Sequence, residues 1–336
     1  MIDLIQRIAP LADQFNRPIT YLRISVTDRC NLRCVYCMPE AGLPWIEKAE
    51  ILTFEEIETI VRAAAAIGVR SIRLTGGEPL VRRDLPRLVA RIAAVPGIED
   101  IALSTNGLLL SDAVAALRSA GLRRVNISLD TLQPQRFFAI ARRPGLDRVL
   151  AGIDAALAAG LGPVKLNCVV MRGRNDDELV DFAELTRTRE LYVRFIEVMP
   201  VHENVELQRS AYISAAEMLD RIRAHGELSA VPGPGGNGPA RYFAFPDAMG
   251  AVGVISPLSH DYCETCNRVR LSADGRLRLC LFGDNEIDLR RPVRDGASLA
   301  DLAAIFRGAM YVKPERHHLD LAKPASAMRA FSEIGG

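Results

Sequence analysis

Six short segments alternate between apolar and polar residues with the two-residue period of a β-strand. They are Thr20–Val26, Ser71–Thr75, Asp100–Ser104, Arg124–Leu129, Pro163–Val170 and Leu191–Val198. Segments with helical spacing separate consecutive strands, and the first opens at a capping-box sequence, Thr53 to Glu56. The other expected helices cover Asp84–Val95, Ser111–Ala120, the residues up to about Ala159, and Asp176–Thr186. This alternation is typical of βα units that form a parallel sheet.

The strands carry an apolar residue at one set of alternate positions and often a polar residue at the other. Leu22 and Ile24 exemplify the apolar set. The polar set includes Arg23, Ser25, Arg73, Thr75, Ser104, Asn106, Asn126, Ser128, Lys165, Asn167 and Arg194. Strands covered by helices on both faces would be apolar at nearly every position. The pattern therefore predicts an α/β protein with an incomplete (β/α)6 TIM-like barrel around a polar cavity. Its functional site is expected at the carboxyl ends of the strands.

The two ends of the chain follow a different pattern. Met1–Arg17 has the spacing of an amphipathic helix. Beyond residue 200 we expect a helix near Ser214–His225, a loop through the Gly- and Pro-rich residues 231–239, and strands at Arg241–Phe245 and Gly250–Ile255. We therefore expect a barrel over residues 1–200 and a C-terminal α+β region over residues 201–336.

Composition narrows the class of protein. The 42 basic and 41 acidic residues leave a net charge of +1, which argues against a general nucleic-acid or membrane surface. The longest apolar run, Val149–Val164, is interrupted by Asp154 and is too short to span a bilayer. We see no N-terminal signal peptide and expect a cytoplasmic protein. In that reducing compartment, clustered cysteines more often bind metal than form disulfides.

Three cysteines, Cys30, Cys34 and Cys37, follow the first strand with the spacing C-x3-C-x2-C. Three thiolates can hold three irons of a [4Fe–4S] cluster and leave the fourth iron open. The spacing resembles the signature of radical S-adenosylmethionine (SAM) enzymes. The alternatives are a zinc site that lacks a ligand, or cysteines that only pack.

A second set comprises Cys263, Cys266 and Cys280. A β-hairpin that turns at Asp274-Gly275, pairs Ala273 with Arg276 and places Cys280 opposite Val269 would return the third thiol to the first two. On spacing alone, zinc with His260 as a fourth ligand and an iron–sulfur cluster are equally plausible. Cys168 has the parity of a helix-facing position and is expected in the core.

Basic residues accompany both cysteine sets. Arg268 and Arg270 share a face of the hairpin, and Arg23, Arg73, Lys165 and Arg194 have the interior parity. Guanidinium groups bind phosphate oxygens through paired hydrogen bonds. The sequence contains no G-x4-G-K-[ST] loop. We therefore expect a cationic cavity for a triphosphate, whereas the alternative for any one arginine is a surface ion pair.

Longer motifs resemble those of the GTP 3′,8-cyclases, the radical SAM lyases of molybdenum cofactor biosynthesis. They are Thr27–Pro39, Leu74–Leu80, Asn126–Asp130, Ile255–His260, Cys263–Leu271 with Cys280–Phe282, and the terminal Gly335-Gly336. The resemblance covers nearly the whole chain. It implies that SAM is cleaved to a 5′-deoxyadenosyl radical, which removes the ribose 3′ hydrogen of GTP. C3′ then attacks C8, and the product is 3′,8-cyclo-7,8-dihydro-GTP.

The resemblance also implies the roles of single residues. Cys30, Cys34 and Cys37 would hold a [4Fe–4S] cluster that binds SAM, and Cys263, Cys266 and Cys280 a second one whose open iron meets the guanine. SAM contacts would come from Tyr36, Gly77, Ser128 and Met199. GTP contacts would come from Arg23, Arg73, Ser104, Lys165, Arg268 and Arg270, although the family usually has threonine where Ser104 stands. The slim tail Gly335-Gly336 would enter the crowded site and be essential there.

Partners are likewise implied by the resemblance. They are an electron donor such as flavodoxin or ferredoxin, cyclic pyranopterin monophosphate synthase, which would receive the product, and a second copy of the chain in a homodimer. Two other hypotheses remain open at this stage. One is a peptide-modifying radical SAM maturase with an auxiliary cluster. The other is a non-catalytic zinc or iron–sulfur sensor, which would not need a polar barrel interior.

Overall fold

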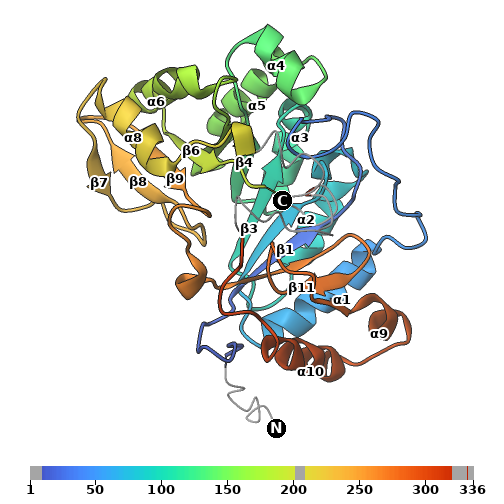
Figure 1. Cartoon of the computed structure of the whole chain (residues 1–336). Helices are drawn as coiled ribbons and strands as arrows, with labels where there is room; N and C mark the ends of the chain where they lie inside the picture. The colour runs from blue at the N-terminus through green and yellow to red at the C-terminus, as the bar shows by residue number, and fades with distance from the viewer. Residues whose placement is uncertain (1–9, 201–208, 320–330, 332–336) are drawn as a thin grey trace.

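The described residues of this computed structural model, 10–200, 209–319 and 331, are organised around one continuous sheet of 12 strands (Figure 1). Its order is β12-β11-β10-β1-β2-β3-β4-β5-β6-β9-β8-β7. The barrel strands are β1 (Tyr21–Ser25), β2 (Ser71–Thr75), β3 (Asp100–Thr105), β4 (Arg124–Ser128), β5 (Val164–Val170) and β6 (Leu191–Glu197). These six strands pair in parallel in sequence order, so the predicted incomplete (β/α)6 barrel is confirmed.

Strands of the C-terminal third extend the sheet beyond both of its ends. They are β7 (Ser229–Val231), β8 (Arg241–Ala244), β9 (Ala251–Ile255), β10 (Arg268–Leu271), β11 (Arg276–Arg278) and β12 (Glu286–Asp288). β9 pairs in parallel with β6, and β10 pairs in parallel with β1. The first and last parts of the chain therefore meet along β1.

Helices cover the outer face of the barrel. They are α1 (Phe54–Ala66), α2 (Leu85–Ala93), α3 (Leu110–Ser119), α4 (Pro134–Ala141), α5 (Leu146–Ala158) and α6 (Leu179–Thr188), with the short 3-10 turns Pro79–Val81 and Asp176–Glu178. The C-terminal part adds α8 (Ala215–Arg223), the turn Cys263–Thr265, α9 (Arg290–Arg294) and α10 (Leu299–Met310). In Figure 1, α9 and α10 lie beside α1, and α8 lies beside the strands β7–β9.

The apolar face of the sheet packs into one core with these helices. Leu22, Ile24 and Leu74 are fully buried, as are Ile57 and Ile60 on the facing side of α1. Helix α1 begins as the capping-box sequence predicts, because the Glu56 amide donates to Thr53 Oγ1 at 3.1 Å and the Thr53 amide donates to Glu56 Oε2 at 2.8 Å. The opposite, polar set of strand positions is left facing the barrel interior.

The predicted N-terminal helix is wrong where the structure describes it, from residue 10 onwards; residues 1–9 lie outside the described part. Instead, Ala12 forms an antiparallel bridge with Pro18. Asp13 Oδ1 accepts hydrogen bonds from the amides of Phe15 and Arg17, both at 3.0 Å, so an aspartate side chain holds a turn in place of helical bonds. Asn16 has a φ of 59°, which is a left-handed conformation that ends any helix.

The hairpin of β10 and β11 forms, but its register differs by one residue from the prediction. Arg270 pairs with Arg278, and the Ser272 amide donates to the Arg276 carbonyl at 2.9 Å, so the loop has three residues instead of two. Gly275 takes a φ of 80°. The Ser272 hydroxyl also accepts the Arg276 amide at 2.9 Å. A left-handed glycine after a turn favours this bulged loop.

A further difference follows β4, where the predicted single helical run is divided into α4 and α5. Arg142 ends α4 with a φ of 55°, and Gly145 precedes α5 with a φ of 133°. The break lets the end of α4 meet the cysteine loop. The amides of Arg33 and Val35 donate to the carbonyls of Ala141 and Ile140, at 2.9 and 3.0 Å.

Candidate functional site

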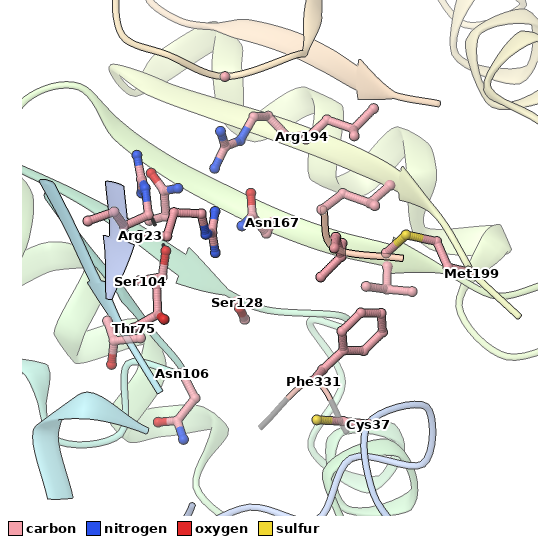
Figure 2. A pocket seen from close by; sticks show the side chains of 18 of the residues that line it. Arg23, Cys37, Thr75, Ser104, Asn106, Ser128, Asn167, Arg194, Met199 and Phe331 are labelled. Atoms are coloured by element: carbon pink, nitrogen blue, oxygen red, sulfur yellow. Dashed lines mark hydrogen bonds between the residues drawn. The ribbon is translucent and has the colours of Figure 1, made fainter. Parts of the chain in front are cut away.

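A cavity of about 280 Å³ lies on the polar face of the sheet. Strand positions of the predicted polar set line it, and they are Arg23, Arg73, Thr75, Ser104, Asn106, Asn126, Ser128, Asn167 and Arg194. Figure 2 shows Cys37, Met199 and Phe331 at one end and Arg23 and Arg194 toward the other. The cavity therefore has a sulfur-lined end and a cationic end.

The sulfur-lined end is formed by Cys30, Cys34 and Cys37, all in the loop after β1 and all half-buried. The loop turns tightly, because the Cys37 amide donates to the Cys34 carbonyl at 2.9 Å. Burial raises the pKa of the Cys34 thiol well above its ordinary value, and Asp130, Cys37 and Cys30 raise it further. Three thiols gathered at a cavity wall fit a cluster that replaces their protons with iron.

Two buried carboxyl groups lie beside this loop. Asp130 accepts the Tyr36 hydroxyl at 2.8 Å and the Val169 amide at 2.8 Å, which ties the cysteine loop to β5. Burial raises the pKa of Asp130 to about 6. Glu78 is 1% exposed and accepts from Thr105 Oγ1 and the Asn106 amide, both at 2.7 Å. Burial raises the pKa of Glu78 to about 7, against those hydrogen bonds.

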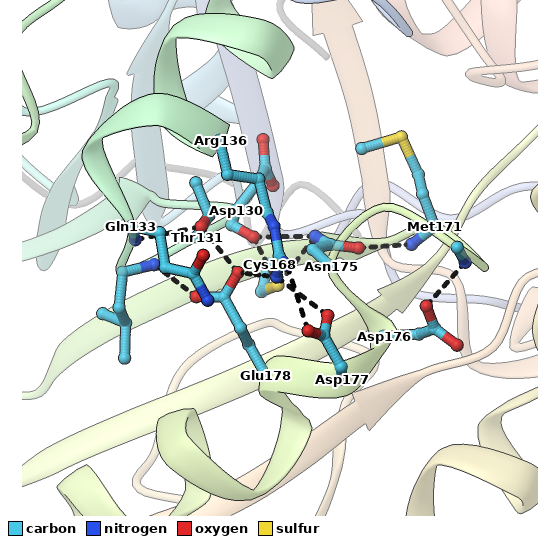
Figure 3. Close-up of polar contacts among 12 residues, drawn as sticks. Asp130, Thr131, Gln133, Arg136, Cys168, Met171, Asn175, Asp176, Asp177 and Glu178 are labelled. Atoms are coloured by element: carbon cyan, nitrogen blue, oxygen red, sulfur yellow. Dashed lines mark hydrogen bonds and ion pairs between the residues drawn. The ribbon is translucent and has the colours of Figure 1, made fainter.

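A buried polar network supports Asp130 from behind (Figure 3). Asn175 Nδ2 donates to the carbonyls of Asp130 and Val169 at 2.7 and 2.9 Å, and its Oδ1 accepts the Met171 amide at 2.7 Å. Cys168 is 1% exposed and packs in the core beside this amide, as its parity predicts. The network fixes the chain directly after β4, where Ser128 faces the cavity.

Two glycines let β2 end against the cysteine loop. Gly76 has a φ of 156°, and its Cβ would lie 2.5 Å from the Thr27 carbonyl oxygen. A Cβ on Gly77 would overlap the Arg29 carbonyl, and the Gly77 amide donates to the Thr27 carbonyl at 2.8 Å. Only residues without a side chain permit this approach. Gly77 consequently presents its backbone to the cavity.

At the cationic end, strand register brings arginines together. Arg270, Arg23 and Arg73 occupy matched positions on β10, β1 and β2. Burial lowers the pKa of Arg23 well below its ordinary value, and the neighbouring charges of Arg270, Arg73 and Arg268 lower it further. Although burial opposes its ionisation, Tyr21 has a pKa lowered to about 8 by the adjacent Arg73, Arg23 and Arg268.

Positive charge is in excess among the described residues that line this end of the cavity. Of the described residues that line the cavity, five are arginines (Arg23, Arg73, Arg194, Arg268 and Arg270) and none is Asp or Glu. Burial lowers the pKa values of Arg194 and Arg270 to about 10. Grouping buried like charges is unfavourable unless an anion enters. A ligand with several phosphates would supply it.

Most of the expected site residues lie around this cavity. They are Cys30, Cys34, Cys37, Tyr36, Gly77, Ser128, Met199, Arg23, Arg73, Ser104, Arg268 and Arg270. Lys165 does not line it, because its ammonium donates to the Gly235 carbonyl at 2.9 Å in the Gly-rich loop. Burial and the nearby Arg194 lower the pKa of Lys165 to about 7. Gly335 and Gly336 lie outside the described residues.

Several lining residues were absent from the SAM and GTP contacts that the resemblance implies, although Arg194 was among the basic residues expected in the cationic cavity. Asn167 Oδ1 and Arg194 Nε are buried and have no hydrogen-bond partner among the described residues, so both can serve a ligand. Their positions in the polar set of alternate strand residues indicate from the sequence that both face the cavity. Asn237, from the Gly-rich loop, and Phe331 also line the cavity. Neither residue belongs to a helix or strand that the sequence pattern predicts.

The second cysteine set lies next to the cationic end. Cys263 is buried, Cys266 and Cys280 are half-buried, and their neighbours Tyr262 and Leu281 line the cavity. Burial raises the pKa of Cys263, and the nearby Cys280 and Cys266 raise it further. Cys266 differs: burial acts to raise its pKa, but Lys313 and Arg268 lower it overall. Within the described ranges, no group of three or more His, Cys, Asp or Glu side chains is arranged for a single metal ion.

Comparison with known protein families identifies the class of this protein and then its family. The Radical SAM superfamily model matches residues 24–186, over the barrel and the first cysteine set, so this is a radical SAM protein. The model named Molybdenum Cofactor Synthesis C matches residues 191–319, which include the second set. The chain belongs to the GTP 3′,8-cyclase family, as the individual relatives make plain.

Those relatives align over almost their full length. The GTP 3′,8-cyclases of Pelotomaculum thermopropionicum and Heliobacterium modesticaldum are each 52% identical, over 97% of this chain and 100% of theirs. The Geobacter sulfurreducens protein of the same name is 48% identical, over 97% of this chain and 99% of its own. The resemblance noted from the motifs is thereby confirmed.

A solved structure supports the fold. SuiB of Streptococcus suis bound to S-adenosylmethionine superimposes with a TM-score of 0.58 over 94% of this chain and 78% of its own, at 14% identity. At that identity the likeness concerns the fold alone. None of the helices that the structure describes is long and apolar enough to cross a membrane.

Proposed function

We propose that this chain converts GTP to 3′,8-cyclo-7,8-dihydro-GTP, the first step of molybdenum cofactor biosynthesis, with a radical obtained from SAM. The main support for the proposal is the difference between the two ends of the cavity. Three cysteines line one end, and five arginines line the other. Full-length relatives named for this reaction, up to 52% identical, support it. Among radical SAM enzymes, a cationic cavity favours a polyphosphate over the peptide substrate of a maturase.

In this proposal Cys30, Cys34 and Cys37 hold a [4Fe–4S] cluster. When bound, it supplies the electron that divides SAM into methionine and a 5′-deoxyadenosyl radical. The SAM contacts that we propose are Tyr36, Gly77, Ser128 and Met199, which all line the cavity. The buried Asp130 orients Tyr36 through its hydroxyl. The raised thiol pKa values at Cys30 and Cys34 mean that iron must displace protons that burial otherwise retains.

We assign GTP binding to Arg23, Arg73, Ser104, Arg268 and Arg270. Ser104 keeps the hydroxyl of the family's usual threonine and accepts Arg73 Nη1 at 3.4 Å, so it orients that guanidinium. Lys165 remains a proposed contact and must leave the Gly235 carbonyl to reach a phosphate; in its present place it adds positive charge beside Arg194. The unpartnered polar atoms of Asn167 and Arg194 offer two further contacts.

We assign the second [4Fe–4S] cluster to Cys263, Cys266 and Cys280, with its open iron toward the guanine. The alternative is zinc with His260 as the fourth ligand. These cysteines flank Arg268 and Arg270, so a nucleotide whose base meets the cluster would keep its phosphates near the arginines. Such positioning places the ribose 3′ hydrogen beside the radical, and removal of this hydrogen lets C3′ attack C8.

Anaerobic reconstitution and turnover test the proposal. We expect about eight irons per chain from two [4Fe–4S] clusters, and SAM cleavage coupled to a cyclised product only when GTP is present. The matched comparison is the same chain with a nucleoside triphosphate that lacks a purine, such as UTP, which has phosphates but no C8. Zinc at the second site, or product formation that does not depend on GTP, would contradict the cyclase assignment.

We also propose that the tail Gly335-Gly336 takes part in the site, since Phe331, four residues before it, lines the cavity. Deletion of both glycines should abolish cyclisation while both clusters still assemble, measured as product against iron content. The matched variant replaces both glycines with alanine, which keeps the length and adds only two methyl groups. Full activity after the deletion would show that the tail has no part in the reaction.

Of the remaining assignments, the partners rest on the family, and the location and the boundary rest on the sequence pattern. We propose flavodoxin or ferredoxin as the electron donor, cyclic pyranopterin monophosphate synthase as the recipient of the product, a homodimer, and a cytoplasmic location. We also propose a boundary near residue 200 between the barrel, residues 1–200, and the C-terminal region, residues 201–336. That region would then supply both the second cluster and the strand β10 that completes the cationic end.

A further inference from the structure

A single lysine is buried against the second cysteine set. Lys313 lies just beyond α10 and is 2% exposed. Its ammonium donates to the Leu279 carbonyl at 2.5 Å, the Arg268 carbonyl at 3.2 Å and Cys266 Sγ at 3.6 Å. Leu279 precedes Cys280, and Arg268 follows Cys266 by two residues. The ammonium therefore joins the two segments that carry Cys266 and Cys280.

The three acceptors match the three protons of an ammonium group, so its hydrogen-bonding capacity is filled. Its positive charge has no carboxylate partner among residues 10–200 and 209–319, because the ion pairs found there include none with Lys313. A buried ammonium is costly without an anion nearby. Two of its contacts are neutral carbonyls. The sulfur of Cys266 is thus the contact that can carry the opposite charge.

The segment that carries Lys313 is held in place from the other side. Arg17 is 6% exposed, and its guanidinium donates to the carbonyls of Cys263, Pro314 and Glu315 at 2.7, 2.7 and 2.6 Å. These bonds tie the residues directly after Lys313 to the first cysteine of the set. The lysine therefore reaches Cys266 from an anchored backbone, and its position is not that of a free surface side chain.

We infer that Lys313, through its contact with the sulfur of Cys266, makes the proposed second cluster easier to reduce. This role rests on the proposed function, since it requires a cluster on Cys263, Cys266 and Cys280. Hydrogen bonds to the sulfurs and nearby charge set the reduction potential of iron–sulfur clusters. If an external reductant such as dithionite added one electron to a cluster held there, the Lys313 ammonium beside Cys266 would stabilise the added negative charge. Lys313 is a positioning residue, because it acts through Cys266.

The test isolates the second cluster in the full-length chain by replacing Cys30, Cys34 and Cys37 with alanine. In this background Lys313→Gln keeps a hydrogen-bond donor but removes the charge. We expect about four irons per chain to remain and the midpoint potential, followed by electron paramagnetic resonance during titration with dithionite, to shift to a more negative value. Arg316→Gln is the matched control. This variant removes a cation from the same segment. The Arg316 side chain is 48% exposed and pairs with Asp261.

An unchanged midpoint potential with four irons retained would overturn the inference. If Lys313→Gln instead loses iron, the thermal unfolding of the iron-free chain distinguishes a role at the cluster from a role in folding. An unchanged unfolding temperature supports a role through the sulfur of Cys266, and a lowered one shows that the lysine only stabilises the fold. If the parent with Cys30, Cys34 and Cys37 replaced takes up no iron, the proposed second cluster is wrong, and the role of Lys313 falls with it.

Discussion

The two cysteine sets share an incomplete complement of three thiols but differ in the buried charged groups beside them. The first set adjoins the buried carboxyl groups of Asp130 and Glu78, and its Cys34 thiol has a raised pKa. The second adjoins Lys313 and Arg268, and its Cys266 thiol has a lowered pKa. The thiol of Cys34 is thus harder to ionise than that of Cys266, although Cys263 of the second set also has a raised pKa.

The difference suits the two proposed ligands. SAM carries a positive sulfonium, which carboxylates attract, and GTP carries several negative charges, which ammonium and guanidinium groups attract. Each set would then favour its own ligand before any specific contact forms. This sorting would keep the triphosphate away from the cluster that is proposed to cleave SAM. Four experiments test whether the two sides of the cavity differ in this way.

The largest effect should come from the cysteines themselves. Cys34→Ala should reduce both SAM cleavage and cyclisation to the assay background, with about four of eight irons lost. Cys280→Ala should lose a similar number of irons but retain uncoupled SAM cleavage, because the first set remains intact. Iron analysis and 5′-deoxyadenosine formation distinguish the two. Loss of all SAM cleavage in Cys280→Ala would show that the sets are not functionally separate.

The acidic side predicts a pH dependence. Since burial raises the pKa of Glu78 from 4.5 to about 7, the protonated group favours the folded state. That stability is fully present below pH 4.5 and is lost as pH rises to about 7, by roughly 3 kcal/mol. Glu78→Gln does not titrate. Denaturant titrations of the iron-free chains measure the unfolding free energy of this variant and of the wild type. Between pH 4.5 and about 7 the variant should become progressively more stable relative to the wild type.

The control for that measurement is Glu264→Gln, beside the second set, because the Glu264 side chain is 77% exposed. Its unfolding free energy should follow that of the wild type at every pH. A constant difference between Glu78→Gln and wild type would mean that Glu78 has the same proton affinity in the folded and unfolded states.

The cationic side predicts a change in GTP affinity. Arg270→Ala removes a buried guanidinium and should cost about 1.5–3 kcal/mol of binding, a rise of roughly 10- to 100-fold in the KM for GTP. Uncoupled SAM cleavage should change much less. The exposed Arg118→Ala, on α3, is the matched loss of one arginine. An unchanged KM for GTP would remove Arg270 from the substrate site.

The smallest effect concerns the orientation of Tyr36. Asp130→Asn weakens the hydrogen bond from the Tyr36 hydroxyl and should lower SAM affinity by about 1 kcal/mol, roughly fivefold. In a Tyr36→Phe background the same replacement should have almost no effect, because the hydroxyl is already absent. Equilibrium binding of SAM to the reconstituted protein measures both. Equal effects in the two backgrounds would mean that Asp130 acts by another route, such as its bond to the Val169 amide.

Local patterns predicted the parts of the site that depend on strand parity. The alternation in β1 and β2 places Arg23 and Arg73 inside, and the spacing after β1 places three thiols in one loop. The hairpin register was wrong by one residue because two- and three-residue loops around Asp274-Gly275 differ only in whether Ser272 or Ala273 closes the loop. Both loops satisfy the same sequence pattern.

Contacts between distant segments could not be predicted. Lys165 has interior parity, yet the Gly235 carbonyl binds it, because a loop 70 residues away folds over the end of its strand. Lys313 meets Cys266 through a contact 47 residues apart in sequence, and no periodicity records such a pairing. The predicted N-terminal helix is wrong over residues 10–17 for a local reason. Asp13 accepts hydrogen bonds from backbone amides that would otherwise bond within a helix.

The parallel pairing of β10 with β1 sets the order in which the protein can mature. Tyr21 in β1 pairs with Arg268 in β10, so the sheet is completed only after most of the chain has been synthesised. Such distant pairing is entropically slow, and β1 meanwhile presents an open edge. In the same event β10 delivers Arg270 beside Arg23 and draws the second cysteine set to the cavity. The cationic end of the cavity is therefore completed later in synthesis than the strands that surround the first cysteine set.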